Sequence, residues 1–238
     1  MKKILFLGIG SLLVMNLLAQ KATINDPNAE MRPVKGFHAI EVSSAIDLYL
    51  SQGDEEAMAV SARDIKWRNR IRTEVVDGVL KISLDNGGFS WTTGNKQLKA
   101  YVSFNNLDHL HASGASDVFV NGMISGDKLE MHLSGASDFK GGVKLNELTL
   151  VQSGASDVQI TGSVGSLTVH ASGASDVKGY DLVTENCTAN ATGASDIHIT
   201  VNKELSARAS GASSVVYKGS AVVKEMRSHG ASSVSKRD

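Results

Sequence analysis

The chain has 238 residues, with 24 basic and 25 acidic side chains, two prolines and a single cysteine. A formal charge of −1, with no basic cluster beyond Lys236-Arg237, excludes nucleic acid as an expected partner. The single cysteine, Cys187, excludes an internal disulfide. The fold must therefore depend on a hydrophobic core, to which we assign this thiol.

The first residues have the pattern of a secretory signal peptide. Lys2-Lys3 precede an apolar run from Ile4 to Leu18, and a Leu-Leu-Ala sequence ends at Ala19. The run is too short for a membrane span and lacks the cysteine of a lipoprotein signal. We expect residues 1–19 to be removed on export and residues 20–33 to form a flexible leader.

Residues 34–107 are predicted to form irregular coils of the same domain as the repeats that follow them. Val42 to Leu50 contains a weak copy of the later repeat, and Asp77-Gly78 is a hairpin-type turn signal. The glycine-rich segment from Asn86 to Gly94 predicts a loop with Trp91 at its tip. Strand-like alternation of apolar and polar residues runs through Ala57 to Ser61, Ile71 to Val75, Val79 to Leu84 and Gln97 to Phe104.

The second half of the chain repeats the phrase Ser-Gly-Ala-Ser-Asp with small changes. Its glycines recur every 18 to 21 residues, a fixed period that predicts a solenoid. Glycine at this position allows a backbone conformation or a close approach that a Cβ would hinder, and the alanine after it is expected to point into the bend. The corner glycines are Gly114, Gly135, Gly154, Gly173, Gly193, Gly211 and Gly230.

Apolar and polar residues alternate on both sides of the repeated phrase, which is the pattern of half-buried strands. Two short strands cannot bury their apolar face alone, so we expect the coils to stack and the inward positions to form one core. The sequence therefore predicts an all-β fold, a parallel β-helix (β-solenoid) with about 20 residues per coil. A single domain is expected over residues 34–238, with regular coils over 108–238. One inward column is Val118, Phe139, Val158, Val177, Ile197, Val215 and Val234.

Three stretches resemble a known protein family. Gly36 to Val42 is similar to the start of the family's sequence, Thr73 to Ile82 to its middle signature, and the Ser-Gly-Ala-Ser run to its most specific feature. The family is the exported putative autotransporter adhesins with a head GIN domain, and the resemblance extends from Val34 to the C-terminus. It implies a right-handed β-helix and a role in adhesion. It also implies the envelope of a Gram-negative bacterium of the Bacteroidetes type, in the periplasm or at the cell surface.

An aspartate follows each of the first five corners and should form a ladder with one carboxylate per coil. Adjacent carboxylates about 5 Å apart repel by roughly 0.8 kcal/mol even in bulk water, so something must offset the repulsion. The favoured interpretation is that each carboxylate accepts hydrogen bonds from a corner N–H or a serine hydroxyl. The alternative is a Ca²⁺ track, which would end where Ser214 and Ser233 replace aspartate. The candidate metal ligands are Asp117, Asp138, Asp157, Asp176 and Asp196.

Histidines form a second candidate group. His111, His132 and His170 share one column, which Val151 interrupts. We interpret them as solvated or strand-pairing side chains, with a zinc site as the alternative. Neighbouring aspartates of the ladder could supply the paired carboxylates of a carbohydrate-active enzyme. The regularity of the ladder argues against this, and we expect no catalytic residues and no cofactor.

Long flat β-faces suit an extended ligand such as a glycan or another protein. Candidate contact residues are the aromatic side chains of Trp67, Trp91, Tyr101 and Tyr217, although core or cap roles are the stronger interpretation. The ends of a solenoid expose unpaired strand edges, which makes a homo-oligomer a reasonable expectation. The sequence thus predicts a non-enzymatic exported binding or adhesion module of the cell envelope. The alternatives are a periplasmic structural or sensing scaffold and a carbohydrate-active enzyme.

Overall fold

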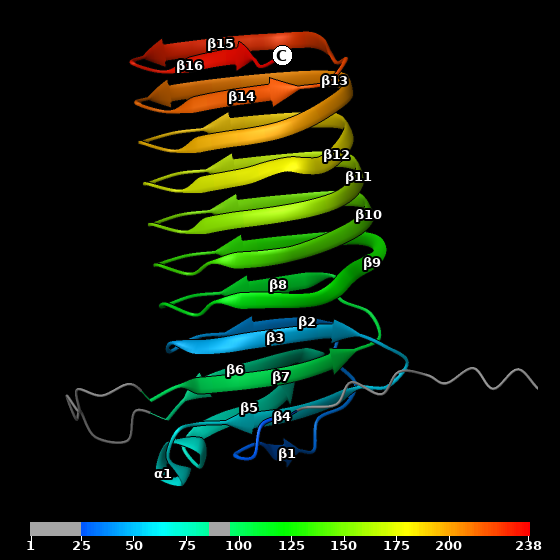
Figure 1. Ribbon diagram of the computed structural model, residues 1–238, viewed down its shortest axis with the longest axis vertical. Helices are drawn as coiled ribbons and strands as arrows, with labels where there is room; N and C mark the ends of the chain where they lie inside the picture. Colours follow the sequence, from blue (N-terminus) through cyan, green and yellow to red (C-terminus); the bar gives the residue numbers. More distant parts are fainter. Residues whose placement is uncertain (1–24, 86–95) are drawn as a thin grey trace, which may run out of the picture.

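The computed structural model describes residues 25–85 and 96–238 of the chain (Figure 1). The predicted signal peptide and the predicted loop with Trp91 lie outside the described residues. The fold is an all-β solenoid, as predicted, and its coils stack along one long axis. In Figure 1 the chain crosses the near face toward the right and returns over the far face as it climbs toward the C-terminus, so the coil is right-handed.

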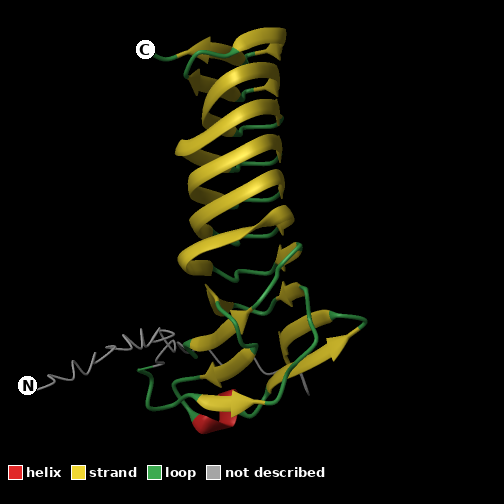
Figure 2. Cartoon of the chain, turned by 90° about the vertical axis from the view of Figure 1, so that its right-hand side faces the viewer, coloured by secondary structure: helices red, strands yellow, loops and turns green. Residues whose placement is uncertain are grey.

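The regular coils are parallel and in register. Phe139 pairs with Val158 and Val158 pairs with Val177, so in these coils a residue lies beside the one 19 positions further on. Except for the first, which has four residues, each strand of the regular coils is long and bends around the coil (Figure 2). The sequence had instead suggested two short strands joined by a turn in each coil. The strands are β8 (His109–Ala112), β9 (Val118–Leu133), β10 (Phe139–Gln152), β11 (Asp157–Ala171), β12 (Asp176–Ala191) and β13 (Asp196–Gly211).

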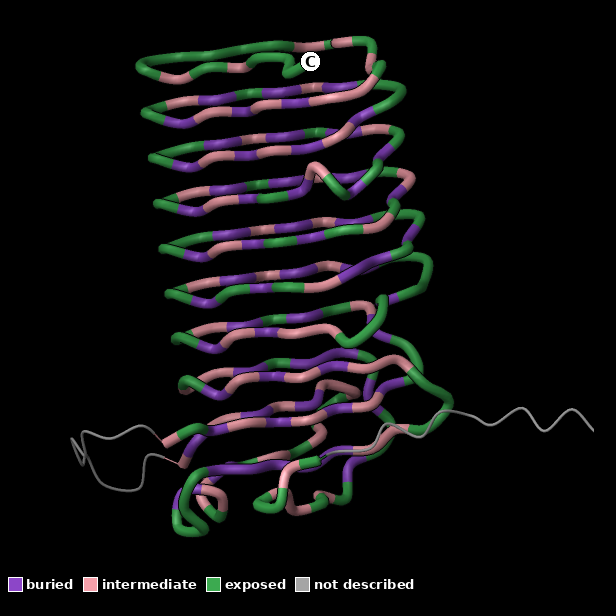
Figure 3. Tube along the Cα trace, in the orientation of Figure 1, coloured by how far each residue is buried: buried purple, intermediate pink, exposed green. Residues whose placement is uncertain are grey.

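The solenoid has two broad faces that meet at the corners (Figure 3). We call the face formed by residues just after each corner the first face, and the face formed by residues just before each corner the second face. At the C-terminal end the coil is divided into shorter strands, and β13 pairs with two of them. These strands are β14 (Ser214–Lys218), β15 (Val222–Gly230) and β16 (Ser233–Lys236).

The N-terminal coils are not stacked in chain order. Strand β2 (Ala39–Val42) lies between β6 (Val79–Leu84) and β8, and β3 (Ile46–Gln52) lies between β7 (Leu98–Phe104) and β9, all in parallel. The coil formed by β2 and β3 is therefore inserted between two later segments of the chain (Figure 1).

Antiparallel strands cover the N-terminal end of the solenoid. Strand β5 (Ile71–Val76) forms a hairpin with β6 through the Asp77-Gly78 turn, where both residues have positive φ. Strand β4 (Ala57–Ser61) pairs with β7 and with β1 (Glu30–Arg32). The last residues of the expected leader thus belong to the sheet. The short helix α1 (Ile65–Arg68) lies beside this cap, and no helix among the described residues is long and apolar enough to cross a membrane.

One continuous core runs through the solenoid. Inward side chains of every regular coil join it, including Val118, Leu129, Phe139 and Leu148. Cys187 lies in the same core, where burial raises the pKa of its thiol to about 12. The thiol therefore stays protonated and acts as a small apolar side chain.

Candidate functional site: the serine and aspartate edge

The repeated phrase forms a single edge of the solenoid, where the corners lie directly above one another (Figure 1). The corner glycines have φ between +77° and +85°, which side chains rarely adopt. A Cβ on Gly154 would lie 2.3 Å from the carbonyl oxygen of Gly135, one coil below. The amide of Ala155 donates to that same oxygen at 2.8 Å. Glycine is therefore required both by the backbone conformation and by the close stacking of the corners.

The second serine of the phrase is buried at the first six corners and half-buried at the last, as Ser232. Ser175 is fully buried, and its hydroxyl donates to the carbonyl of Ser172 at 2.8 Å, which closes the bend. The alanine beside it, Ala174, is exposed, so our expectation that alanine points into the bend is wrong. A positive-φ glycine turns the chain so that the residue two positions later faces inward. The buried serines are Ser116, Ser137, Ser156, Ser175, Ser195 and Ser213.

Replacement of Ser175 by alanine is expected to lower the free energy of unfolding by about 1–2 kcal/mol, because a buried carbonyl loses its partner. Urea denaturation of the purified chain measures the change. Ser163→Ala is the matched control, since Ser163 is exposed on the outside of the same solenoid. Equal effects of the two substitutions would contradict a structural role for the corner hydroxyl.

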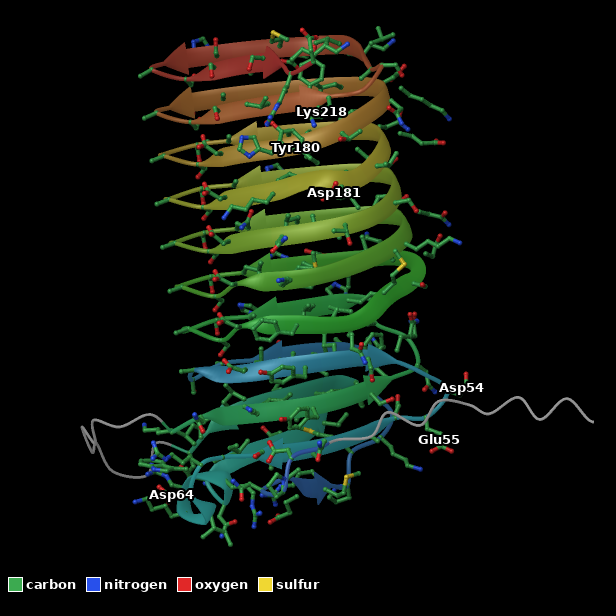
Figure 4. The ribbon with its side chains drawn as sticks, viewed as in Figure 1. Asp54, Glu55, Asp64, Tyr180, Asp181 and Lys218 are labelled. Carbon is green, nitrogen blue, oxygen red and sulfur yellow. The ribbon has the colours of Figure 1, made fainter. Side chains whose placement is uncertain are left out.

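Two carboxylates of the aspartate ladder accept hydrogen bonds from the backbone of the next coil. Asp117 Oδ1 accepts a hydrogen bond from the amide of Asp138 at 3.3 Å, and Asp138 Oδ1 accepts one from the amide of Asp157 at 2.9 Å. Further along the ladder, Asp196 Oδ1 accepts from the Ser214 hydroxyl at 2.6 Å. A column of oxygen atoms follows the edge in Figure 4. This geometry corresponds to the hydrogen-bonded interpretation of the ladder.

The lower end of the ladder has one further carboxylate, from outside the repeated phrases. Asp47 of β3 is the neighbour of Asp117 in the coil below. Leu48 pairs with Val118, and each of the two aspartates lies one residue before its member of this pair. Burial raises the pKa of Asp47, and the charge of Asp117 adds to the effect. Burial also raises the pKa of Asp117, where the Asp138 amide opposes the shift and the Asp138 carboxylate adds to it.

The carboxylates are spread along a line, one per coil, and do not converge on a point. Within residues 25–85 and 96–238 there is no group of three or more histidine, cysteine, aspartate or glutamate side chains that could hold a metal ion. Asp157 has a cation of the protein's own as a neighbour, since Lys178 Nζ lies 3.0 Å from its Oδ2. A Ca²⁺ ion on this edge would have to take its carboxylate ligands from separate coils.

Histidines of the predicted column have acidic neighbours that the sequence pattern did not reveal. His132 Nε2 lies 2.6 Å from Glu130 Oε1, while the rings of His111 and His132 meet edge to face at 6.2 Å. His170 lies apart from them, with its Nδ1 3.4 Å from the Asn190 amide. The column is thus a set of polar surface contacts.

Another histidine, His109, lies between two carboxylates and contacts both. Its Nδ1 lies 2.9 Å from Asp108 and its Nε2 lies 3.3 Å from Glu130. His38 also contacts Asp108 at 3.0 Å, and His132 completes the group on Glu130. We call these five residues the histidine–carboxylate chain; they connect the segment before β2 with β8 and β9.

The histidine–carboxylate chain gives a pH-dependent contribution to stability. Burial raises the pKa of Asp108, but hydrogen bonds from His38 and His109 outweigh it and leave the pKa below the ordinary 3.8. The hydrogen bond from His132 leaves the pKa of Glu130 below the ordinary 4.5. Lowered folded-state pKa values stabilise the fold above the ordinary pKa values, and this contribution is lost as pH falls through the folded values.

We expect the melting temperature of Asp108→Asn/Glu130→Gln to lie below that of the parent chain at pH 6, and the gap to narrow below pH 4.5. Melting curves recorded between pH 7 and pH 3 test this. A gap that stays constant over the whole range would show that the two carboxylates do not contribute through their charge.

The candidate aromatic contact residues take different places. Trp67 and Tyr217 are buried, in agreement with core or cap roles, and Trp91 lies outside the described residues. Tyr101 is half-buried and stacks at 5.1 Å on Tyr49, which stacks at 5.2 Å on Phe119. Because these rings turn their faces to one another, they offer mainly their edges to solvent.

The stacked corners, the single core and the in-register parallel coils define the protein as a right-handed β-solenoid with a polar corner edge. Residues 36–221 match the family described as putative auto-transporter adhesin, head GIN domain, and the chain belongs to this family.

Three crystal structures of putative adhesins share the fold. The one from Bacteroides fragilis has 20% sequence identity and a TM-score of 0.81 over 88% of this chain and 96% of its own. The one from Parabacteroides distasonis has 17% identity and a TM-score of 0.68, with the same two coverages. The one from Parabacteroides merdae has 16% identity and a TM-score of 0.65 over 88% and 95%. Comparison with curated proteins gives no match.

Proposed function

We propose that the protein is a non-enzymatic, exported binding module of the cell envelope that holds an extended ligand, a glycan or a surface protein, along its outer faces. The observation that carries the proposal is the repetition of outward side chains from coil to coil. Thr149, Thr168 and Thr188 pair in register on the second face and present one hydroxyl per coil. A ligand with its own repeating units would meet the same chemistry at each step.

The adhesion role is supported by the family to which the chain belongs, and export is supported by the pattern of the first 19 residues. The regular ladder supports a non-enzymatic role, since four of its five carboxylates are engaged with amides, a hydroxyl and a lysine of neighbouring coils.

A periplasmic structural scaffold is the second candidate. It is favoured by the same ladder, because the polar groups of the corner edge bind one another and add rigidity to the solenoid itself. In that case the outer faces would need no ligand. Cellular location separates the two candidates.

The first test is antibody labelling of intact and permeabilised cells with serum against the mature chain. Labelling of intact cells is expected for an adhesion module. Labelling only after permeabilisation would overturn the adhesion role and leave the scaffold.

The second test is a binding screen against glycan and host-protein arrays, with face-specific variants. Thr149→Glu/Thr168→Glu/Thr188→Glu alters the second face, and Lys140→Glu/Gln159→Glu/His198→Glu alters the equivalent positions of the first face. A bound ligand should be lost with one variant and retained with the other. Loss with both or with neither would contradict binding along a face.

A further inference from the structure

The N-terminal end of the solenoid carries a cluster of cations around one tryptophan. The Trp67 side chain of α1 is only 9% exposed and packs into the core. Its ring has Lys96 Nζ at 4.3 Å, Arg70 Cζ at 4.9 Å and Lys66 Nζ at 5.9 Å. The amide of Arg63 donates to the Lys96 carbonyl at 3.0 Å, which places a fourth basic residue beside them. We call Arg63, Ile65, Lys66, Arg70 and Lys96 the basic tip.

Most of this positive charge is not neutralised within the protein. Lys66 has only a distant ion pair with Asp64, at 4.0 Å. Arg70 donates to the backbone carbonyl of Asp85, which leaves its charge in place. Neither Arg63 nor Lys96 forms an ion pair with a described residue. The four cations counted together with Asp64 give this corner a net charge of +3, in a chain whose total is −1.

The charge of the basic tip does not depend on the neighbouring part of the chain that is not described. Residues 86–95, Asn-Gly-Gly-Phe-Ser-Trp-Thr-Thr-Gly-Asn, contain no charged side chain. The acidic residues Asp54 and Glu55 lie at the opposite edge of the solenoid from α1 (Figure 4). An anionic partner would therefore meet mainly cations at this corner of the molecule.

An exposed aliphatic side chain lies within the cations. Ile65 begins α1 and is 65% exposed; Arg63 and Asp64 precede it in the chain, and Lys66 follows it. Met31 of β1, at the same end of the solenoid, is also 65% exposed. α1 projects from the end of the molecule, where it can meet a flat partner (Figure 2).

Cations that surround an exposed aliphatic group suit the surface of an anionic bilayer. The lysine and arginine side chains pair with headgroup phosphates, and the aliphatic group enters the boundary of the acyl chains. A soluble polyanion would use the cations but would gain nothing from Ile65.

We propose that the basic tip binds the surface of a membrane rich in anionic lipid headgroups. The last coil lies at the far end of the solenoid from α1, so this contact would hold the regular coils away from the bilayer (Figure 1). The faces proposed to hold an extended ligand would remain free. The two proposals therefore use separate surfaces and can fail separately.

Vesicle co-sedimentation tests the proposal. The apolar run 4–18 would itself insert into lipid, so the experiment uses residues 20–238, which contain every described element. Vesicles of phosphatidylglycerol with phosphatidylcholine are compared with pure phosphatidylcholine at low and high salt. We expect binding to the anionic vesicles only, and weaker binding at high salt.

Substitutions locate the contact. Each cation near an anionic surface contributes about five-fold to partitioning, so Arg63→Gln/Lys66→Gln/Lys96→Gln should weaken binding roughly a hundred-fold. Ile65→Ser should weaken it several-fold with the charge unchanged. Lys140→Gln/Lys144→Gln/Lys236→Gln removes the same charge from exposed sites on other coils and should change binding little. Circular dichroism checks that each variant is folded.

Three outcomes would overturn the proposal. The first is equal binding to neutral vesicles, and the second is equal loss in the tip and control variants. The third is binding of heparin, a soluble polyanion, that is as tight as vesicle binding and insensitive to Ile65→Ser, which would identify a polyanion site instead. Success with vesicles and failure on the arrays would leave the membrane contact standing without the extended-ligand function.

Discussion

Replacement of Gly154 by alanine is expected to lower the free energy of unfolding by about 3 kcal/mol or more, among the largest effects of a single methyl group. Two costs add. The φ of +84° disfavours any residue with a Cβ, and the new Cβ would lie 2.3 Å from the Gly135 carbonyl oxygen. That oxygen belongs to backbone and already accepts a hydrogen bond from Ala155, so the coils must separate to make room.

Gly122→Ala is the matched control for this prediction. Gly122 has φ +85°, yet a Cβ there would meet nothing within 4 Å. Its cost should therefore be the conformational strain alone, about 1–2 kcal/mol. Urea denaturation of both variants measures the difference. If both lost the same stability, close stacking of the corners would not be the reason for glycine at this edge.

The repeat was sufficient to predict the solenoid because the information it carries is local. Period-two alternation sets which side chains face inward, and the fixed period sets which residues meet in the next coil. Val158 and Leu167 are buried in one core for this reason. Once the period is regular, it also assigns each strand of a parallel stack its partner, the equivalent strand of the next coil.

The irregular N-terminal half could not be arranged from the same information. The β2–β3 coil lies between segments that come later in the chain, because β2 pairs with residues 40 positions later in β6 and 70 positions later in β8. Alternation within each segment shows that it is a strand, but not which edge it joins. For the same reason, the alternation does not show that β4 pairs with β7 in the antiparallel direction.

The sequence predicted which residues form the corner edge, but not which of their side chains face inward. Serine, glycine and alanine are all small, so hydropathy does not say which of them faces inward. The positive φ of glycine decides it, and the serine reaches a carbonyl three residues back. The presence of serine at the fourth position of all seven phrases, while the first and fifth positions vary, is the signal that could have identified it.

The histidine–carboxylate chain was missed for a different reason. His38 and Asp108 are 70 residues apart, and they meet only because β2 pairs with β8. The repeat places His111 and His132 in one column, but it does not show which side chains of a neighbouring column they contact. The basic tip depends in the same way on Lys96 returning to α1 from a distant part of the chain.

Replacement of Phe139 by alanine is the second large expected effect, about 3–5 kcal/mol of unfolding free energy. Phe139 is 1% exposed and fills the inward column between Val118 and Val158. Backbone pairing on both sides fixes the spacing of the coils, so the walls cannot move in to fill the space that the ring leaves. Most of the cavity should therefore remain, and the loss of unfolding free energy increases with the volume of the cavity that remains.

Phe119→Ala provides the same truncation on the outside of the solenoid. Phe119 is half-buried on the first face and stacks on Tyr49 at 5.2 Å, so its loss should cost only about 0.5–1.5 kcal/mol beyond the small area it buries. Because each coil contacts only its neighbours, the inward variant should also lose amide-exchange protection first in β9, β10 and β11. Equal losses of stability at the two positions would mean that the inner column is not the part of the coil that holds the stack together.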